Sequence, residues 1–362
     1  NFTNVFRNNG MDGLKIVSMG AVKVERSEAN YNQDYGFHIS TRGSITLKDL
    51  TGNSNGYNGL YANNQVSGSS ANVALTSSNN MRNTFNDNGV KEAIVYPGVD
   101  IQSYGNISIQ NTDALLNYAA GIHLNNKTAP TARTITIADV NTSENQGSGL
   151  LAYSKGNITV KGLTSSHNSL IGSDIVYAGE TVYERLTTIS SFDNWWFSAP
   201  ADGHVSIILQ SLEFNAYLEL YDANGNLIAW DDDGYEDFDA QIEIDLPAGG
   251  AYYIHVRSAN LNRGNYVLSI NDSTQLYGTN FFFYGALLDN SNGTGSVTIT
   301  SGKSMPFNAF NDHNYRGIEI QTNGRITTTN LTATDNGNTG AYLSNSNGTG
   351  TITVSTNDKN SL

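Results

Sequence analysis

The 362-residue sequence lacks cysteine, which excludes both disulfide bonds and thiolate metal sites. It has only 5 prolines, so it is not a proline-rich linker. Only 14% of its residues are charged, and the net charge of −14 argues against binding to nucleic-acid backbones. No apolar run is long enough for a membrane-spanning helix, and residue 1 begins no signal peptide. Because residue 1 is not Met, we expect the chain to be a piece of a longer protein.

Glycine, in contrast, is abundant, and it recurs at a fixed period. The segments 13–36, 36–59, 149–172 and 317–340 each run from one glycine to another in 23 residues. A second glycine follows the first after seven residues, and asparagine stands four residues before the closing glycine. This slot holds asparagine in eight repeats, namely Asn9, Asn32, Asn55, Asn88, Asn117, Asn145, Asn168 and Asn336. It holds His313 once and shifts once, near Asn280, and in the longer repeat after Gly59 we expect Glu92 in the glycine slot.

A repeat this short predicts a parallel β-solenoid. Apolar residues such as Ile45 and Leu47 alternate with polar ones such as Thr46, which is the period of a strand with one buried face. Stacked repeats then share one core, and the asparagines can hydrogen-bond each other from repeat to repeat. The alternative role for these asparagines is ligand binding. We expect the solenoid to span residues 1–177 and to continue over 275–362.

A different composition separates these two parts. Residues 180–272 hold 16 acidic and only 3 basic residues, together with all three tryptophans. Alternating runs at 204–212, 216–222, 226–233, 240–246, 251–258 and 265–271 predict short strands, joined by turns such as "DANGN" and "PAGG". We therefore predict an antiparallel jelly-roll β-sandwich over residues 178–274, inserted at a loop of the solenoid. Deleting it should leave the solenoid folded, because Gly172 and Gly285 occupy equivalent slots.

Two resemblances support this division. The ordered text "FDNWWFSAPADGHVSIIL", "LELYDANGNLIAWDDD" and "LPAGGAYYIHVRS" resembles the bacterial pre-peptidase C-terminal domain. This resemblance implies a jelly-roll sandwich and a secreted context, and some relatives bind calcium or substrate polymers. The repeats resemble the right-handed β-helix repeats of bacterial surface and filament proteins, a class that includes adhesins and pectate-lyase-like enzymes.

The acidic segment offers a candidate Ca²⁺ site. Asp222 and Asn224 have the spacing of a calcium loop, and Asp231, Asp232 and Asp233 follow close behind. Asp231 and Asp233 would share one face of a strand, where a cation would relieve their repulsion. The alternatives are a two-residue hairpin turn at Asn224 and a solvated acidic loop.

The histidines do not indicate catalysis. We expect His38, His123, His167 and His313 at different positions of the repeat, so they would not gather in one site. Asp49 beside Lys48 is interpreted as an isolated, solvent-facing pair. The predicted protein is therefore a structural segment of an extracellular or cell-surface filament, sheath or adhesin, from which the acidic domain projects. The alternative is a secreted carbohydrate-active β-helix enzyme with an accessory binding domain.

The ends of the sequence fit each other. Written before the head "NFTNVFRNNG", the tail "TITVSTNDKNSL" completes one long repeat of the kind seen at 72–89 and 296–314. We therefore expect the chain to stack head-to-tail on itself, as tandem repeats or as a filament, with about ten repeats and on the order of 48 Å per copy. Surface polysaccharide and other cells are further candidate partners.

Overall fold

The computed structural model describes residues 4–65, 70–78, 81–91, 94–168, 174–175, 181–186, 192–199, 203–222, 226–235, 238–247, 250–259, 264–270, 284–313, 315–336 and 338–356. All regular elements in these ranges are strands, so the predicted all-β class is confirmed. The chain divides into two compact units, one formed by residues 1–168 with 283–362 and the other by residues 169–282. Among the described residues there is no long apolar helix of the kind that crosses a membrane.

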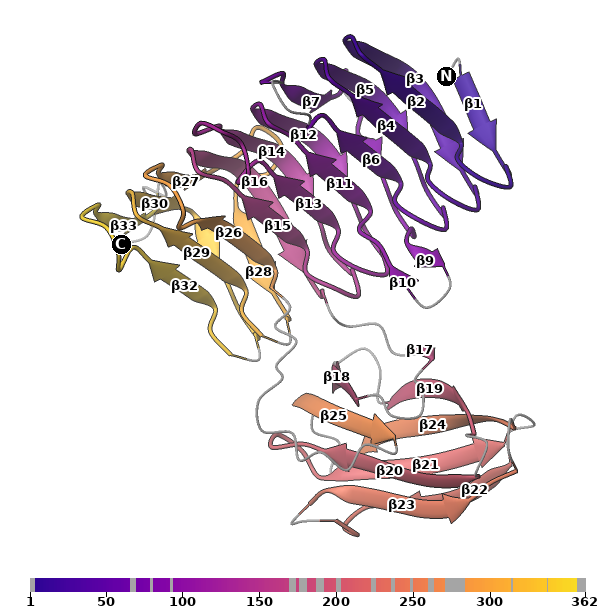
Figure 1. Ribbon diagram of the computed structural model, residues 1–362. Coiled ribbons are helices and arrows are strands. Elements are labelled where there is room, and N and C mark those ends of the chain that lie inside the picture. The colour runs from indigo at the N-terminus through magenta and orange to yellow at the C-terminus, as the bar shows by residue number, and fades with distance from the viewer. Residues whose placement is uncertain are drawn as a thin grey trace. The chain divides into compact units, whose positions relative to one another are not determined.

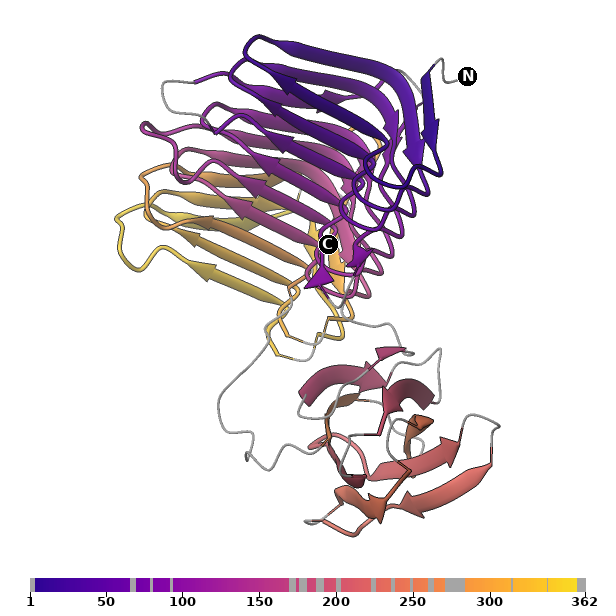
Figure 2. The same ribbon diagram turned by 45° about the vertical axis from the view of Figure 1, so that its right-hand side comes forward.

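The first unit is built from two large sheets whose strands are all parallel (Figures 1 and 2). A nine-stranded sheet contains, in spatial order, β2 (Leu14–Ser18), β4 (Phe37–Thr41), β6 (Leu60–Asn63), β11 (Val99–Gln102), β13 (Ile122–Asn125), β15 (Leu150–Tyr153), β26 (Ala286–Asn290), β29 (Ile318–Thr322) and β32 (Ala341–Ser344). A 13-stranded sheet contains β1 (Asn4–Arg7), β3 (Val22–Asn30), β5 (Ile45–Thr51), β7 (Val73–Thr76), β8 (Asn83–Thr84), β12 (Ile107–Asp113), β14 (Ile135–Asn141), β16 (Ile158–Ser166), β27 (Val297–Thr300), β28 (Asn308–Asn311), β30 (Ile326–Thr329), β31 (Leu331–Thr332) and β33 (Ile352–Ser355). A short antiparallel hairpin, β9 (Val90–Lys91) and β10 (Ile94–Val95), stands apart from both.

The chain passes alternately between the two sheets, adding strand after strand to each. Leu14 pairs with Phe37 and Phe37 pairs with Leu60, so the 23-residue period of the sequence is the register of the nine-stranded sheet. The longer repeat that starts at Gly59 ends at a different residue from the one we expected. Val99 pairs with Leu60, so Gly98 rather than Glu92 occupies the glycine slot. The hairpin β9–β10 lies between Asn88 and this glycine and displaces the slot along the sequence.

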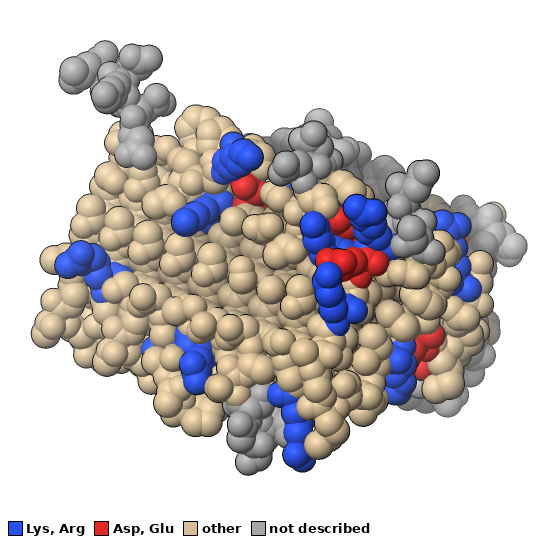
Figure 3. Space-filling model, turned by 90° about the horizontal axis from the view of Figure 1, so that it is seen from above, with Lys and Arg blue, Asp and Glu red and all other residues tan. Residues whose placement is uncertain are grey.

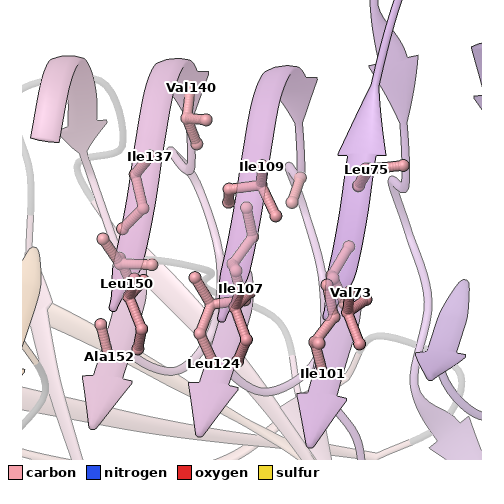
Figure 4. Close-up of a cluster of buried hydrophobic side chains, with 14 of the residues drawn as sticks. Val73, Leu75, Ile101, Ile107, Ile109, Leu124, Ile137, Val140, Leu150 and Ala152 are labelled. Atoms are coloured by element: carbon pink, nitrogen blue, oxygen red, sulfur yellow. The ribbon is translucent and has the colours of Figure 1, made fainter. Parts of the chain in front are cut away.

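Apolar columns fill the space between the two sheets. Ile45, Val73, Ile107 and Ile135 are consecutive partners in the 13-stranded sheet, and each is at most 1% exposed. Figure 4 shows side chains of this kind from neighbouring strands packed against each other. One repeat contributes only a few such residues, so burial is achieved by stacking. Fully burying each aliphatic side chain stabilises the fold by about 1.5–3 kcal/mol.

Asp49 is not the isolated surface pair that we expected. It is 1% exposed and has a positive φ of 55° at a bend within β5. Its carboxylate accepts hydrogen bonds from the backbone N–H and from the hydroxyl of Ser78, the latter at 2.7 Å. Asp139 does the same in β14, where its Oδ1 accepts from the backbone N–H of Ser304 at 2.8 Å. Asp49 thus holds the loop of the next, longer repeat, whereas Asp139 reaches a loop of the repeat two strands further along the sheet.

The second unit interrupts the first between two neighbouring strands. Leu150 of β15 pairs directly with Ala286 of β26, so Gly285 follows Gly149 in the stack. Among the described residues, no strand of this sheet lies between β15 and β26, where Gly172 and the shift near Asn280 predicted a further repeat. Both residues lie outside the described ranges. The nine-stranded sheet therefore has one repeat fewer than the sequence predicts, because the second unit departs from a turn rather than from the end of a complete repeat.

The second unit contains two mainly antiparallel sheets. One has the order β17 (Asp174–Ile175), β19 (Phe192–Ser198), β24 (Ala251–Ser258), β21 (Ala216–Asp222) and β22 (Leu227–Asp231). The other has the order β18 (Thr181–Leu186), β25 (Gly264–Ile270), β20 (His204–Gln210) and β23 (Ala240–Asp245). A buried cluster that includes Ile207, Leu220 and Ile254 forms its core. All six strands expected from the alternating runs are present, with ends that differ by at most two residues.

Candidate functional site

The asparagines of the repeat slot form a continuous hydrogen-bonded column. From Asn9 to Asn145, each donates from its backbone N–H and its Nδ2 to the Oδ1 of the following asparagine, at 2.8–3.1 Å, and Asn168 is the last acceptor. The members between Asn32 and Asn168 are at most 3% exposed. Their polar atoms are thus used within the protein, which favours a structural role over ligand binding.

The column changes where the second unit departs. After Asn168 the slot belongs to His313, whose Nε2 lies 2.8 Å from the backbone oxygen of Ser165. The backbone N–H of His313 donates to Oδ1 of Asn336 at 3.2 Å, so Asn336 continues the same column. The recurring glycine also has a reason here. A Cβ on Gly98 would lie 2.5 Å from Nδ2 of Asn117, which is too close for any larger residue.

The acidic segment is organised as turns. β22 ends at Asp231, so strand alternation does not extend to Asp233, contrary to the premise of the predicted calcium site. Oδ2 of Asp231 accepts from the backbone N–H groups of Gly234 and Gln241, each at 2.8 Å, and Oδ1 of Asp233 accepts from Asn215 at 3.3 Å.

The remaining candidate ligands are also spread out. The carboxylate of Asp222 accepts from the backbone and side chain of Asn226, and Asp232 is half-buried. Asn224 lies outside the described residues. In the part of the chain that is described, no three His, Asp or Glu side chains converge as metal ligands. Calcium binding stays a prediction.

A cluster of aromatic side chains lies on and beside the outer face of the nine-stranded sheet. We define the tyrosine cluster as Tyr35, His38, Tyr57, Tyr61 and Tyr96. The ring of Tyr35 lies 4.5 Å from that of His38, 5.0 Å from that of Tyr57 and 5.7 Å from that of Tyr61, and the rings of Tyr57 and Tyr96 are 4.6 Å apart. Burial and the neighbouring phenols raise the pKa of Tyr35 to about 12, so its hydroxyl stays neutral at physiological pH.

Paired charges accompany the rings along this face. Oδ2 of Asp12 lies 3.2 Å from Nδ1 of His38 and 3.3 Å from Nζ of Lys15. Further along, Oδ1 of Asp100 lies 3.1 Å from Nδ1 of His123 and accepts from Gln102 at 2.6 Å. Each carboxylate therefore has a nitrogen partner within reach.

The face continues toward β32 with the same chemistry. Nζ of Lys127 lies 2.7 Å from Oδ2 of Asp289. Burial alone would raise the pKa of Asp289, but hydrogen bonds from Lys127 and Ser291 outweigh it and lower that pKa. The guanidinium of Arg316 pairs with Glu319 and lies 4.1 Å from the ring centroid of Tyr342.

Our sequence reasoning missed this face and misplaced its histidines. His38 and His123 occupy the same column of the sheet, separated by Tyr61 and Asp100, whereas they were expected at different positions. The signal was available, because each stands two residues after the glycine of its repeat. The tyrosines were harder to detect, since they come from turns as well as strands.

The second unit presents another aromatic surface, on the outer side of its five-stranded sheet. Trp230 is 56% exposed, and its ring stacks on that of Tyr217 with the ring centroids 5.7 Å apart. The guanidinium carbon of Arg257 lies 3.6 Å from the centroid of the Tyr217 ring. On the same strand as Tyr217, Glu219 lies 3.2 Å from Nδ1 of His255 and 3.4 Å from Arg257. Burial lowers the pKa of His255, which favours its neutral form.

Comparison with known proteins finds a family similarity in one part of the chain, within the second unit. Residues 191–258 match the bacterial pre-peptidase C-terminal domain family, so the predicted domain of this type is confirmed there. A similar solved structure is the pre-peptidase C-terminal domain of a collagenase from Bacillus anthracis. It is 16% identical, with a TM-score of 0.25, and the match covers 27% of this chain and 93% of that one. No curated protein matches the chain.

Proposed function

We propose that the two parallel sheets form a right-handed β-solenoid and that the chain is a structural segment of an extracellular filament, sheath or adhesin. In this proposal copies stack head-to-tail, and the acidic sandwich is an accessory domain. The match to a bacterial pre-peptidase C-terminal domain supports a secreted or cell-surface location, because the family resemblance implies a secreted context. The main support for the proposal is that the two end strands, β1 and β33, leave apolar residues and strand edges open among the described residues.

The last strand exposes residues that are buried everywhere else in their columns. Ile352 pairs with Ile326, and Val354 pairs with Thr328. Both partners are 0% exposed, whereas Ile352 is 43% and Val354 is 65% exposed. Among the described residues no strand pairs with the outer edge of β33. An open strand edge with apolar residues is a surface on which another chain can pair.

The first strand leaves a matching gap at the opposite end of the stack (Figure 1). β1 pairs only with Ser27–Asn30 of β3, so within the described ranges Val22–Glu25 has no strand on its outer edge. β33 covers Ile326–Thr329, the first part of the preceding repeat, while β31 pairs only with β28 among the described strands. The tail therefore offers the first half of a repeat, and the head offers the second half.

Asparagine side chains give this fit a chemical basis. Asn83 and Asn308 each begin the second half of a longer repeat, and each accepts at Oδ1 from the backbone of the preceding repeat, Leu50 N–H at 2.9 Å and Leu163 N–H at 3.0 Å. Asn4 begins the second half of the head repeat in the same way. A stacked copy would supply the equivalent donor, the backbone N–H of its Leu331.

The asparagine column would also continue across the junction. Asn9 is exposed, and its Oδ1 accepts no hydrogen bond from the residues described. At the other end, Asn336 is half-buried and has the backbone N–H that the other members donate to the next asparagine. Stacking would place Asn9 next after Asn336. Because this contact does not close on itself, it would propagate as a fibre.

The alternative, a carbohydrate-active β-helix enzyme, has less support. Asp100 and Asp289 lie on strands three steps apart in the nine-stranded sheet, about 14 Å at the usual strand spacing. Paired catalytic carboxylates of glycoside hydrolases are about 5–9.5 Å apart. The carboxylates of this face are also held in ion pairs, and the lowered pKa of Asp289 opposes a role as general acid.

A disulfide ladder tests the stacking. Thr353 of the tail and Lys23 of the head belong to one outward column of the 13-stranded sheet, so stacking would bring them side by side. Because the chain has no cysteine, a Lys23→Cys/Thr353→Cys variant has a clean background. Under mild oxidation it should form a ladder of covalent multimers, since neighbouring strands allow disulfide geometry.

The matched control is Lys23→Cys/Thr298→Cys, in which the second cysteine lies in the same column but inside the sheet. A ladder from Lys23→Cys/Thr353→Cys and none from the control supports the proposal. Monomers alone from both variants, or equal ladders, contradict it.

A further inference from the structure

The two outer faces of the first unit differ in chemistry although their backbones are alike. The outward column of the 13-stranded sheet is Lys23, Thr46, Ala74, Ser108, Thr136, Thr159, Thr298, Thr327 and Thr353, with no aromatic residue. Figure 3 shows one face of the molecule on which charged side chains form small groups separated by uncharged surface. The nine-stranded sheet instead carries the tyrosine cluster and a series of ion pairs. Strand propensity favours threonine and tyrosine alike, so it does not explain this segregation.

We propose that the tyrosine cluster, together with Asp100, Gln102 and His123, is a binding site for a neutral polysaccharide. The sugar chain would lie across β4, β6, β11 and β13, along the direction in which the strands stack. This inference goes beyond the structural role proposed above and does not depend on head-to-tail stacking.

The rings provide the apolar half of the recognition. Tyr35, Tyr57, Tyr61 and Tyr96 are half-buried and hold one another at 4.6–5.7 Å, so they lose little side-chain freedom on binding. An aromatic ring offers a flat apolar face with a polar tip, which suits a pyranose ring with its C–H face and its hydroxyl rim. Neighbouring parallel strands place such side chains at a spacing of about 4.8 Å, and a regular row of contacts suits an extended polymer.

The polar groups provide the other half. Asp100 accepts hydrogen bonds, Gln102 both donates and accepts, and His123 presents a ring nitrogen. All three are half-buried. Asp100 is the strand partner of Tyr61 on one side and of His123 on the other, and Gln102 lies two residues further along β11. Hydroxyl groups of a sugar can donate and accept at once, so this mixed set fits them better than it fits an apolar surface.

The charges indicate that the sugar is neutral. Lys15 is paired with Asp12, and Lys127 is paired with Asp289. A polyanionic glycan would therefore find no excess of cations on the described part of this face. It would also have to displace existing ion pairs, at a desolvation cost.

A peptide strand is a poorer occupant. β4, β6 and β11 are paired on both sides within the sheet, so they have no free edge for strand addition. Recognition must therefore occur on the ring and side-chain surface.

Native electrophoresis in gels containing a soluble polysaccharide tests the proposal with the intact chain. The probes are dextran, soluble starch, xyloglucan and hydroxyethylcellulose as neutral chains, alginate as a polyanion and gelatin as a polypeptide. We expect retardation by at least one neutral probe. Tyr57→Ala/Tyr61→Ala should weaken that interaction at least tenfold, and Tyr57→Phe/Tyr61→Phe should retain most of it.

The matched control is Thr136→Ala/Thr159→Ala on the opposite sheet, which should bind like the unmodified chain. Circular dichroism checks that each variant is folded, and the single Tyr61→Ala change replaces the double one if that variant is unfolded. The proposal is overturned if no neutral probe retards the chain, if only alginate or gelatin does, or if the tyrosine variants bind unchanged.

Discussion

Val354→Asp is expected to abolish head-to-tail association while leaving each copy folded. Val354 is 65% exposed on β33, and its column is buried in the preceding repeat, where Thr328 is 0% exposed. Completing the burial of this valine would stabilise the junction by about 1–2 kcal/mol. A carboxylate at the same place would instead have to be desolvated without a partner, at a cost of several kcal/mol. Together these effects predict association at least about 100-fold weaker.

Sedimentation velocity over a concentration series measures this effect. The control is Thr353→Asp, one residue away on the same strand and in the column that faces outward. It adds the same charge at the same end of the stack, but it leaves the apolar contact in place. Thr353→Asp should assemble nearly as well as the unmodified chain, whereas Val354→Asp should stay monomeric. Equal assembly of both variants would refute the reasoning.

Four further results are expected. Asn117→Ala leaves the two buried donors of Asn88 unsatisfied and should lower the free energy of unfolding in urea by about 2–4 kcal/mol, with a smaller loss for Asn336→Ala at the open end of the column. The lowered pKa of Asp289 means that its pairing stabilises the fold above about pH 4, the unfolded pKa, and loses this effect as the pH falls through the folded value. Acid unfolding of Lys127→Met should therefore differ from that of the unmodified chain above pH 4 and converge below it. Ca²⁺ at a hundredfold excess over Kd should stabilise the second unit by about 2.7 kcal/mol, and identical melting curves with calcium and with chelator would rule out that site. Replacing residues 169–282 by one glycine restores the spacing found between Asn145 and Gly149, and loss of the β signal or of protease resistance would show that the second unit is needed for the parallel sheets.

Local patterns in the sequence were sufficient for the strands and for the asparagine column. The six runs of the second unit alternate clearly, and each strand has its partners within the same short segment. The asparagine slot was visible because one geometric requirement recurs at every repeat. Asn117, for instance, must sit against Gly98 and between two other asparagines. Such a requirement leaves a fixed spacing in the sequence.

Features that depend on which repeats become neighbours were not predictable in this way. Gly149 and Gly285 are adjacent in the stack, although the second unit separates them in the sequence. Asp49 has its partner Ser78 in the loop of another repeat, so its burial is not encoded near residue 49. The tyrosine cluster likewise combines side chains of different offsets, which only the stacked register brings together.

Electron microscopy of the assembled protein tests the central claim most directly. The nine-stranded sheet gives each copy nine steps along the stack, rather than the ten counted from the sequence. Head-to-tail stacking therefore predicts filaments with an axial repeat of about 43 Å, at roughly 4.8 Å for each strand. The second unit would recur once in each such repeat. Single, unassembled particles at high protein concentration, or filaments with a repeat unrelated to nine strands, would contradict the account.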